Sequence, residues 1–154
     1  MLVNGNESVN RMKYLTEQIV FQEIPSEISL AFEITNCPRR CPGCHTPELQ
    51  GDCGEVLTIQ KFDQICEKYA SYDGKYMFGC VLFLGGEQHP EMSDFLEHCR
   101  KKGLKTALYT GANSVDLNVL KNLDYVKLGE YNEALGALGQ PTSNQVLFQL
   151  QRVK

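Results

Sequence analysis

Three cysteines stand close together in the first third of the chain, at Cys37, Cys41 and Cys44. Their spacing is Cys-x3-Cys-x2-Cys, and an apolar run over residues 28–34 precedes them. Thiolates bind iron–sulfur clusters and zinc, and three neighbouring thiols cannot all pair with one another as disulfides. Three protein ligands on a four-coordinate metal leave one position open. The spacing therefore predicts a metal site with one position available for chemistry.

Two kinds of metal site fit these cysteines. A zinc site would recruit His45 as a fourth ligand, giving Cys3His, but Cys44 and His45 are adjacent, which makes tetrahedral closure awkward. Structural zinc sites also tend to show two paired cysteine clusters, and the chain has no second one. We therefore favour an iron–sulfur cluster and keep a Cys3His zinc-binding structural or interaction domain as the alternative of another class.

The remaining cysteines show no Cys-x2-Cys spacing, which makes a second cluster a poor expectation. They are Cys53, Cys66, Cys80 and Cys99. Free cysteine is among the most buried residue types, so the last three are predicted to fill the core. Cys53 is expected in a loop.

Length and composition indicate one domain, residues 1–154, whose first 13 residues we expect to be flexible. The net charge of −4 argues against nucleic acid as a direct partner. No apolar run is long enough for a membrane span, and the N-terminal residues lack the apolar core of a signal peptide. With an odd count of 7 cysteines, this favours a reducing, cytoplasmic setting.

Hydrophobic periodicity predicts an α/β fold. Strands are expected at residues 16–24, 28–35, 80–84, 104–109 and 125–128, with a last extended segment at 144–153. Helices are expected from Thr58 to a stop at Tyr72-Asp73-Gly74, from Pro90 to Gly103, and over 115–123. Alternating strands and helices indicate βαβ units and a parallel sheet. Since only four such strands are visible, we expect a partial (β/α) barrel or an open parallel sheet, with an extra N-terminal β segment.

Four unusual segments each follow a predicted strand. They are the cysteine loop, Gly85-Gly86-Glu87, Tyr109-Thr110-Gly111 and Gly129-Glu130-Tyr131. The carboxyl ends of parallel strands share one edge of a sheet, where ligands bind in α/β folds. We therefore expect the four segments to converge on one site.

The cysteine motif and Gly85-Gly86-Glu87, about 40 residues later, resemble the radical S-adenosylmethionine (SAM) superfamily. The resemblance implies a partial barrel in which Cys37, Cys41 and Cys44 hold a 4Fe-4S cluster. SAM chelates its open iron, and one electron releases a 5′-deoxyadenosyl radical. Gly85 and Gly86 would let the backbone approach SAM, and Glu87 would accept hydrogen bonds from the methionine ammonium.

Other SAM contacts are assigned by position only. Tyr109 and Thr110 are candidates for the ribose, and Glu130 for the adenine end. Relatives usually carry an aromatic residue before the third cysteine, whereas this chain has Gly43, so we expect His45 to stack on the adenine instead.

A narrower resemblance covers residues 28–150, where the chain is similar to the activating proteins of anaerobic ribonucleotide reductases. It is carried by the cysteine motif with His45, Leu82 to Glu87, Leu108 to Gly111, Asp124 to Lys127, Leu135 to Gly139 and Thr142 to Gln145. The Asn144-Gln145 tail separates this group from activases such as that of pyruvate formate-lyase.

The narrower resemblance implies a glycyl radical made on the large subunit of an anaerobic ribonucleoside-triphosphate reductase. Flavodoxin or ferredoxin would donate the electron. Hydrogen-atom abstraction needs no general base, and no catalytic dyad or triad is visible. Another glycyl radical enzyme or a small molecule remains the alternative substrate. Arg39 and Arg40 either keep the loop soluble or dock an acidic partner.

No motif surrounds the other two histidines or the basic helix end. For His89 and His98 we expect surface or helix-cap positions, and for Arg100-Lys101-Lys102 a solvated helix end.

Overall fold

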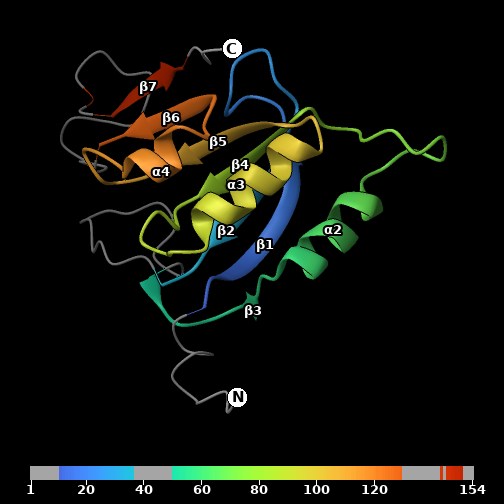
Figure 1. Ribbon diagram of the computed structural model, residues 1–154, viewed down its shortest axis with the longest axis horizontal. Coiled ribbons are helices and arrows are strands. Elements are labelled where there is room, and N and C mark those ends of the chain that lie inside the picture. Colours follow the sequence, from blue (N-terminus) through green and yellow to red (C-terminus); the bar gives the residue numbers. More distant parts are fainter. Residues whose placement is uncertain (1–10, 37–49, 130–142, 144, 151–154) are drawn as a thin grey trace.

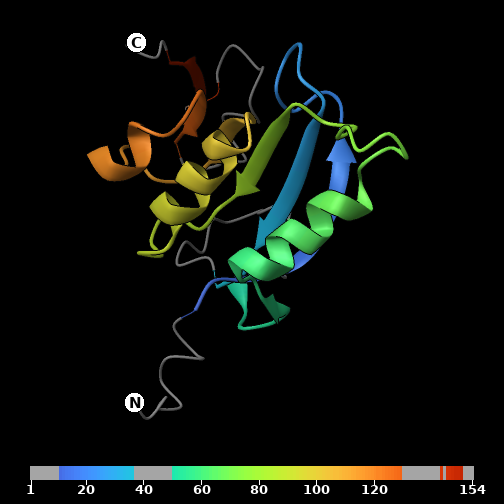
Figure 2. The same cartoon turned by 45° about the vertical axis from the view of Figure 1, so that its right-hand side comes forward.

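The computed structural model describes residues 11–36, 50–129, 143 and 145–150. In these residues one sheet of seven strands carries its helices on one face (Figures 1 and 2). In chain order the elements are β1 (Lys13–Val20), β2 (Ser29–Ile34), β3 (Glu55–Val56), α2 (Ile59–Lys68), β4 (Cys80–Leu84), α3 (Met92–Lys101), β5 (Lys105–Tyr109), α4 (Leu117–Leu120), β6 (Tyr125–Leu128) and β7 (Val146–Gln149).

The centre of the sheet is parallel and both of its sides are antiparallel. The strand order is β3-β1-β2-β4-β5-β6-β7. Strands β2, β4, β5 and β6 are mutually parallel neighbours, whereas β1 runs antiparallel to β2 and β7 antiparallel to β6. The expected parallel α/β core and the extra N-terminal β segment are confirmed. The described sheet is open, because β3 and β7 form its two edges.

Local sequence signals account for the two longer helices. The Thr58 hydroxyl accepts a hydrogen bond from the Lys61 amide at 3.0 Å and so caps the first turn of α2. Helix α3 places Asp94 in its first turn and Lys101 in its last, as the helix dipole favours. Gly103, with a φ of +80°, follows its end and turns the chain into β5.

Hydrophobic residues cover both faces of the central strands. On the helix side, Phe32 and Phe83 stack with ring centroids 5.6 Å apart, and Phe62 of α2 meets Phe95 of α3 at 6.1 Å. On the opposite face a smaller cluster forms around Leu82. Its buried members are Ile24, Ala31, Cys80, Leu82, Ala107 and Tyr125. Burial on both faces explains why the sequence of β4 is a continuous apolar run.

The N-terminal boundary differs from the prediction that residues 1–13 are flexible. Met12 is fully buried, and its amide donates to the Glu91 carboxylate at 2.8 Å. Lys13 opens β1, three residues before the predicted start of that strand. The short strand β3, which pairs with β1, was not predicted because two residues carry no periodic signal.

Two predicted helices are shorter than expected. Helix α2 ends at Lys68 rather than at Tyr72-Asp73-Gly74, because the chain turns back there. The turn is held by the Ser71 hydroxyl on the Asp73 carboxylate and by a bridge between Ala70 and Tyr76. Helix α4 covers only Leu117–Leu120 of the predicted 115–123.

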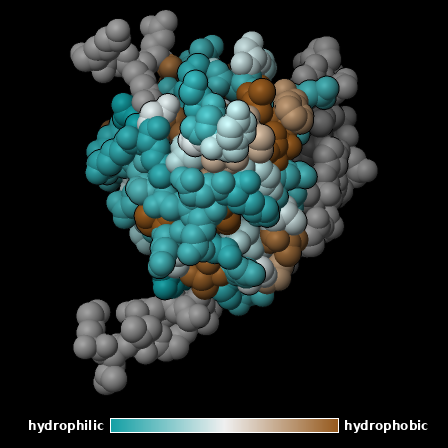
Figure 3. All heavy atoms as spheres, turned by 90° about the vertical axis from the view of Figure 1, so that its right-hand side faces the viewer, coloured by the Kyte–Doolittle hydropathy of each residue, from teal (hydrophilic) through white to brown (hydrophobic). Residues whose placement is uncertain are grey.

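The surface on the side of α2 and the turn that follows it is mainly hydrophilic, with separate hydrophobic groups (Figure 3). Tyr72 at the tip of the turn is fully exposed. Within the described ranges, no helix is long and apolar enough to cross a membrane.

Helices α2 and α3 are joined by a charged network that the sequence did not indicate. The Asp63 carboxylate lies 2.8 Å from His98 Nε2 and 3.2 Å from Lys102 Nζ, and Lys102 also donates to the Tyr76 hydroxyl. Arg100 donates to Asn122. The prediction of a wholly solvated helix end at Arg100-Lys101-Lys102 is therefore wrong for its first and last members.

This network predicts a pH-dependent contribution to stability. Burial alone would raise the pKa of Asp63, but hydrogen bonds from His98 and Lys102 outweigh it and hold the pKa below its usual value. A carboxyl with a lowered folded-state pKa stabilises above its unfolded pKa, near 4, and stops doing so as the pH falls through the folded value. Asp63→Asn should lower the free energy of unfolding by about 0.5–1 kcal/mol at pH 7, since the group is partly exposed.

Urea unfolding at pH 7 and below pH 3 measures this difference, which should vanish at the lower pH. Glu97→Gln, which removes an exposed pair with Lys101, is the control and should change stability little at either pH. An Asp63→Asn deficit that persists below pH 3 would contradict the electrostatic origin.

Candidate metal centre

The carboxyl ends of the four parallel strands form one edge, and the loops that leave it are joined to one another. The Gly85 amide donates to the Tyr109 carbonyl at 2.8 Å, and the Thr110 amide to the Lys127 carbonyl at 3.0 Å. The Gly129 amide then donates to the Ala112 carbonyl at 2.9 Å. The predicted convergence is confirmed for these loops, while Glu130 and Tyr131 lie outside the described residues.

The cysteine motif also lies outside the described residues, together with His45, Gly43, Arg39 and Arg40. Both flanks of residues 37–49 are described, and they meet at the carboxyl end of β2. The Asn36 amide donates to the Gly51 carbonyl at 3.1 Å, and its side chain donates to Asp52 at 2.9 Å. The segment that carries the three cysteines therefore starts and ends at one place on the sheet edge.

A charged anchor fixes this junction to the N-terminal strand. Asp52 accepts from Lys13 Nζ at 2.9 Å, and the hydrogen bonds from Lys13 and Asn36 hold the pKa of Asp52 below its usual value. Asn36 adopts a φ of +60°, which asparagine tolerates better than most residues. This conformation turns the chain out of β2 immediately before Cys37.

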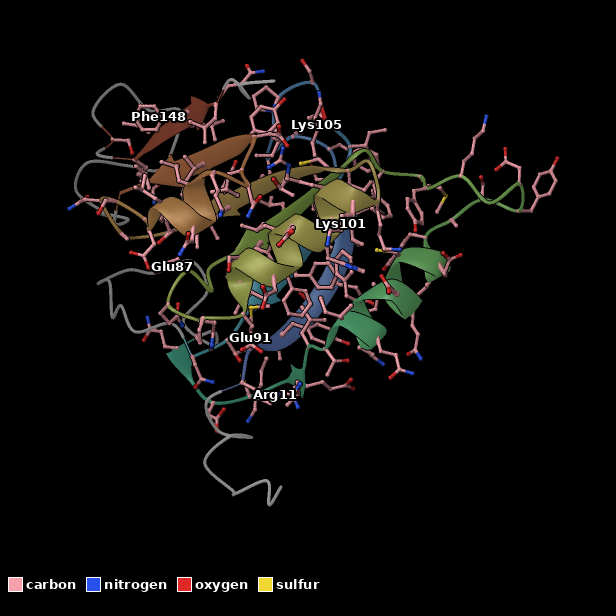
Figure 4. All side chains as sticks on the ribbon, viewed as in Figure 1. Arg11, Glu87, Glu91, Lys101, Lys105 and Phe148 are labelled. Atoms are coloured by element: carbon pink, nitrogen blue, oxygen red, sulfur yellow. The ribbon has the colours of Figure 1, made fainter. Side chains whose placement is uncertain are left out.

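The Gly85-Gly86-Glu87 loop lies against the same junction. The Gln88 side-chain amide donates to the Asn36 carbonyl at 3.2 Å. Gly85 and Gly86 have φ values of +92° and +100°, which side chains rarely adopt. Glu87 is half-buried beyond the end of β4 (Figure 4), and among the described residues it has no hydrogen-bond or ion-pair partner. The two predicted parts of the site thus come together from separate strands.

The two predicted ribose contacts have partners within the protein. The Tyr109 hydroxyl donates to the Glu23 carbonyl, and burial, helped by the charge of Glu23, raises the pKa of Tyr109 to about 12. The buried Thr110 hydroxyl accepts from the Ala112 amide at 2.9 Å. Both residues lie at the expected edge, and their contact with a ribose stays a prediction.

The sequence analysis missed a row of residues across the sheet face opposite the helices. In register, the row consists of Glu33, Leu84, Tyr109 and Lys127. All four are half-buried, and the Lys127 ammonium lies 4.6 Å from the centre of the Tyr109 ring. Glu33 and Lys127 stand three strand spacings apart, about 14 Å, and Leu84 and Tyr109 lie between them. This arrangement suits a ligand that carries both a positive and a negative charge.

A sequence signal for this row existed. Glu33 interrupts an otherwise uncharged strand, and Lys127 interrupts another, each at its carboxyl end. Recognising them as neighbours required the strand register, which the sequence alone does not supply.

Three of the described cysteines are poor metal ligands. Cys66, Cys80 and Cys99 are fully buried, as predicted for core residues. Burial raises the pKa of Cys66 and of Cys80 to about 12, and that of Cys99 well above its usual value. Thiols that stay protonated do not bind metals.

The described ranges contain no group of three or more His, Cys, Asp or Glu able to hold a metal ion. Cys53 is partly exposed next to the junction at Asp52. Cys37, Cys41 and Cys44 lie outside the described residues, and their role as metal ligands stays a prediction.

Comparison with known families identifies the kind of site. The model of the family described as 4Fe-4S single cluster domain matches residues 28–148. The chain belongs to this family. The match runs from the residue before β2 into β7 and so covers the whole parallel sheet. It supports the iron–sulfur interpretation over the Cys3His zinc alternative. A comparison with curated proteins gave no match.

The close packing around Gly86 predicts that a side chain at this position disturbs the loop after β4. A Cβ at Gly86 would lie 2.7 Å from Met92 Cε and 3.2 Å from Ile34 Cγ2, in addition to the strain of its φ. Gly86→Ala should therefore lower the free energy of unfolding by about 1–3 kcal/mol and reduce iron retention.

Gly74→Ala is the matched control, since Gly74 has a φ of +84° but open space around its Cβ position. Thermal unfolding and iron content of both variants separate backbone strain from crowding at the site. Equal effects in the two variants, with iron retained in both, would show that crowding at Gly86 is unimportant.

Proposed function

We propose that this protein is a radical SAM activase that generates a glycyl radical on an anaerobic ribonucleoside-triphosphate reductase. One observation carries the proposal. In a chain of the 4Fe-4S single cluster family, Gln88, the residue directly after Gly-Gly-Glu, donates a hydrogen bond to the carbonyl of Asn36, the residue before the cysteine motif. This contact supports a role in which Glu87 would accept hydrogen bonds from the ammonium group of an amino acid bound at the open iron.

Separate residues are proposed to bind the cluster and SAM. Cys37, Cys41 and Cys44 would hold the cluster, and Gly85 and Gly86 would let the methionine end of SAM approach the backbone. Glu87 would accept hydrogen bonds from its ammonium group. When bound, the cluster supplies the electron that cleaves SAM to methionine and a 5′-deoxyadenosyl radical.

The sheet face opposite the helices offers a floor for the rest of SAM. The row from Glu33 to Lys127 lies directly below the edge where the loops meet. Tyr109 and Thr110 are proposed for the ribose from their place at this edge, while His45 and Glu130 are proposed for the adenine from the sequence alone. The radical would remove a hydrogen atom from a glycine Cα of the partner, so the chain needs no general base.

The decisive experiment is electron paramagnetic resonance of the partner reductase. The reconstituted protein is incubated anaerobically with a candidate large subunit, SAM and reduced flavodoxin or ferredoxin. A glycyl radical signal that depends on SAM supports the proposal. SAM cleavage without a radical on the reductase would point to another glycyl radical enzyme or a small molecule. Colourless protein with stoichiometric zinc after iron and sulfide reconstitution would refute it.

The cluster ligands predict a sharp contrast between two cysteine variants. Cys41→Ala should abolish cluster binding and SAM cleavage, because two thiolates do not replace three. Cys66→Ala should keep stoichiometric iron while lowering stability by about 1 kcal/mol, since it removes one buried sulfur atom.

Iron and sulfide analysis with visible absorption measures both cysteine variants. Full iron content in Cys41→Ala would show that the ligand assignment is wrong.

Glu87 is predicted to act on SAM rather than on the cluster. Glu87→Gln keeps the shape of the side chain but removes its charge, so the dissociation constant for SAM should rise roughly tenfold. Iron content should stay unchanged. Equilibrium dialysis of reconstituted protein with labelled SAM provides the measurement, with Glu67→Gln, an exposed carboxylate on α2, as the control. Unaltered SAM affinity in Glu87→Gln would remove this role.

A further inference from the structure

The His89 side chain is one of the few buried polar groups of the described chain, with 8% of its surface exposed. It follows the Gly-Gly-Glu-Gln loop directly, and its burial contradicts the surface position that the sequence analysis gave as one of two expectations. Its backbone is fixed on both sides, because its amide donates to the Gly86 carbonyl and its carbonyl accepts from the Met92 amide, each at 3.1 Å. These bonds fix the His89 backbone between the loop and the start of α3.

The donors and acceptors around His89 determine which of its two ring nitrogens carries the proton. The Asn36 carbonyl can only accept, so the Gln88 atom 3.2 Å away is the amide nitrogen. The same nitrogen carries a second hydrogen and lies 3.4 Å from His89 Nε2. That ring nitrogen must accept, which places the ring proton on Nδ1.

The other ring nitrogen of His89 lies near the carboxylate of Glu91, the residue before α3. His89 Nδ1 lies 3.9 Å from Glu91 Oε1, and the same oxygen accepts from the Met12 amide at 2.8 Å. A protonated Nδ1 beside a carboxylate is the favourable orientation, so Glu91 supports the tautomer in which Nε2 is the acceptor. Figure 4 shows Glu91 at the start of α3, near the N-terminal end of β1.

We propose that His89 is a positioning residue for the metal centre. By accepting one hydrogen of the Gln88 amide, it directs the other hydrogen onto the Asn36 carbonyl. Asn36 adopts a left-handed conformation one residue before Cys37, and the hydrogen bond to its carbonyl helps to hold that conformation where the chain leaves the sheet. The consequence for the cluster rests on the proposed function, whereas the effect on Asn36 does not.

Three variants test the proposal. His89→Met keeps the volume but removes the acceptor, Gln88→Leu removes the donor at an exposed position, and His89→Gln retains an acceptor near the place of Nε2. His98→Met is the matched control, because His98 pairs with Asp63 between α2 and α3.

The first measurement uses the full chain before cluster reconstitution. The Asn36 amide donates to the Gly51 carbonyl, so its hydrogen exchange, followed by nuclear magnetic resonance, reports on the junction. Exchange should be roughly tenfold faster in His89→Met and Gln88→Leu, and near the wild-type rate in His89→Gln and His98→Met. Wild-type exchange in both His89→Met and Gln88→Leu would overturn the proposal.

The second measurement uses reconstituted protein. The midpoint potential of the cluster and its paramagnetic resonance spectrum with and without SAM should change in His89→Met and Gln88→Leu and be restored in His89→Gln. If the wild type binds and cleaves SAM but these variants match it in both properties, positioning of the cluster is refuted and the proposed function stands. If the wild type neither assembles a cluster nor cleaves SAM, the proposed function fails, and hydrogen exchange alone decides the role of His89.

Discussion

The parallel pairing of β2, β4, β5 and β6 is the constraint on which the rest of the structure depends. Because neighbouring strands run in the same direction, each connection must return over one face, and the helices α2, α3 and α4 occupy that face (Figure 2). The same pairing brings four loop beginnings to one edge. Segments separated by about 50 residues, such as those of Asn36 and Gln88, therefore meet there, as the strand pattern predicted.

Burial determines the protonation of the described core cysteines. The pKa of a thiol rises when water is removed around it, so Cys66, Cys80 and Cys99 remain protonated, apolar members of the core. A metal site needs thiolates, which the interior of the sheet does not favour. The described residues on either side of the cysteine motif, Asn36 and Gly51, are joined by a backbone hydrogen bond at the end of β2.

Strong local signals allowed much of the fold to be predicted from the sequence. The bounds of β4 and β6 and the Thr58 cap agree with prediction because each follows from residues close in sequence. Burial of Met12 and His89, and the pairing of β3, depend instead on contacts with residues far along the chain. The same division applies to the candidate site, where motif spacing singled out Glu87, whereas only the strand register shows that Glu33 and Lys127 belong to one row across the sheet.

The start of β1 contacts two distant parts of the chain, and these contacts stiffen the junction at Asn36. Lys13 binds Asp52 and the Met12 amide binds Glu91, so the start of β1 contacts both the junction at Asn36 and the beginning of α3. A loop closed by one hydrogen bond opens readily, whereas here an ion pair, backbone hydrogen bonds and the Gln88 amide act together. Cluster chemistry requires a fixed distance between metal and substrate, because misplacement by about 1 Å costs rate steeply. The N-terminal strand, though remote in sequence, therefore stabilises the junction at Asn36 and the beginning of α3.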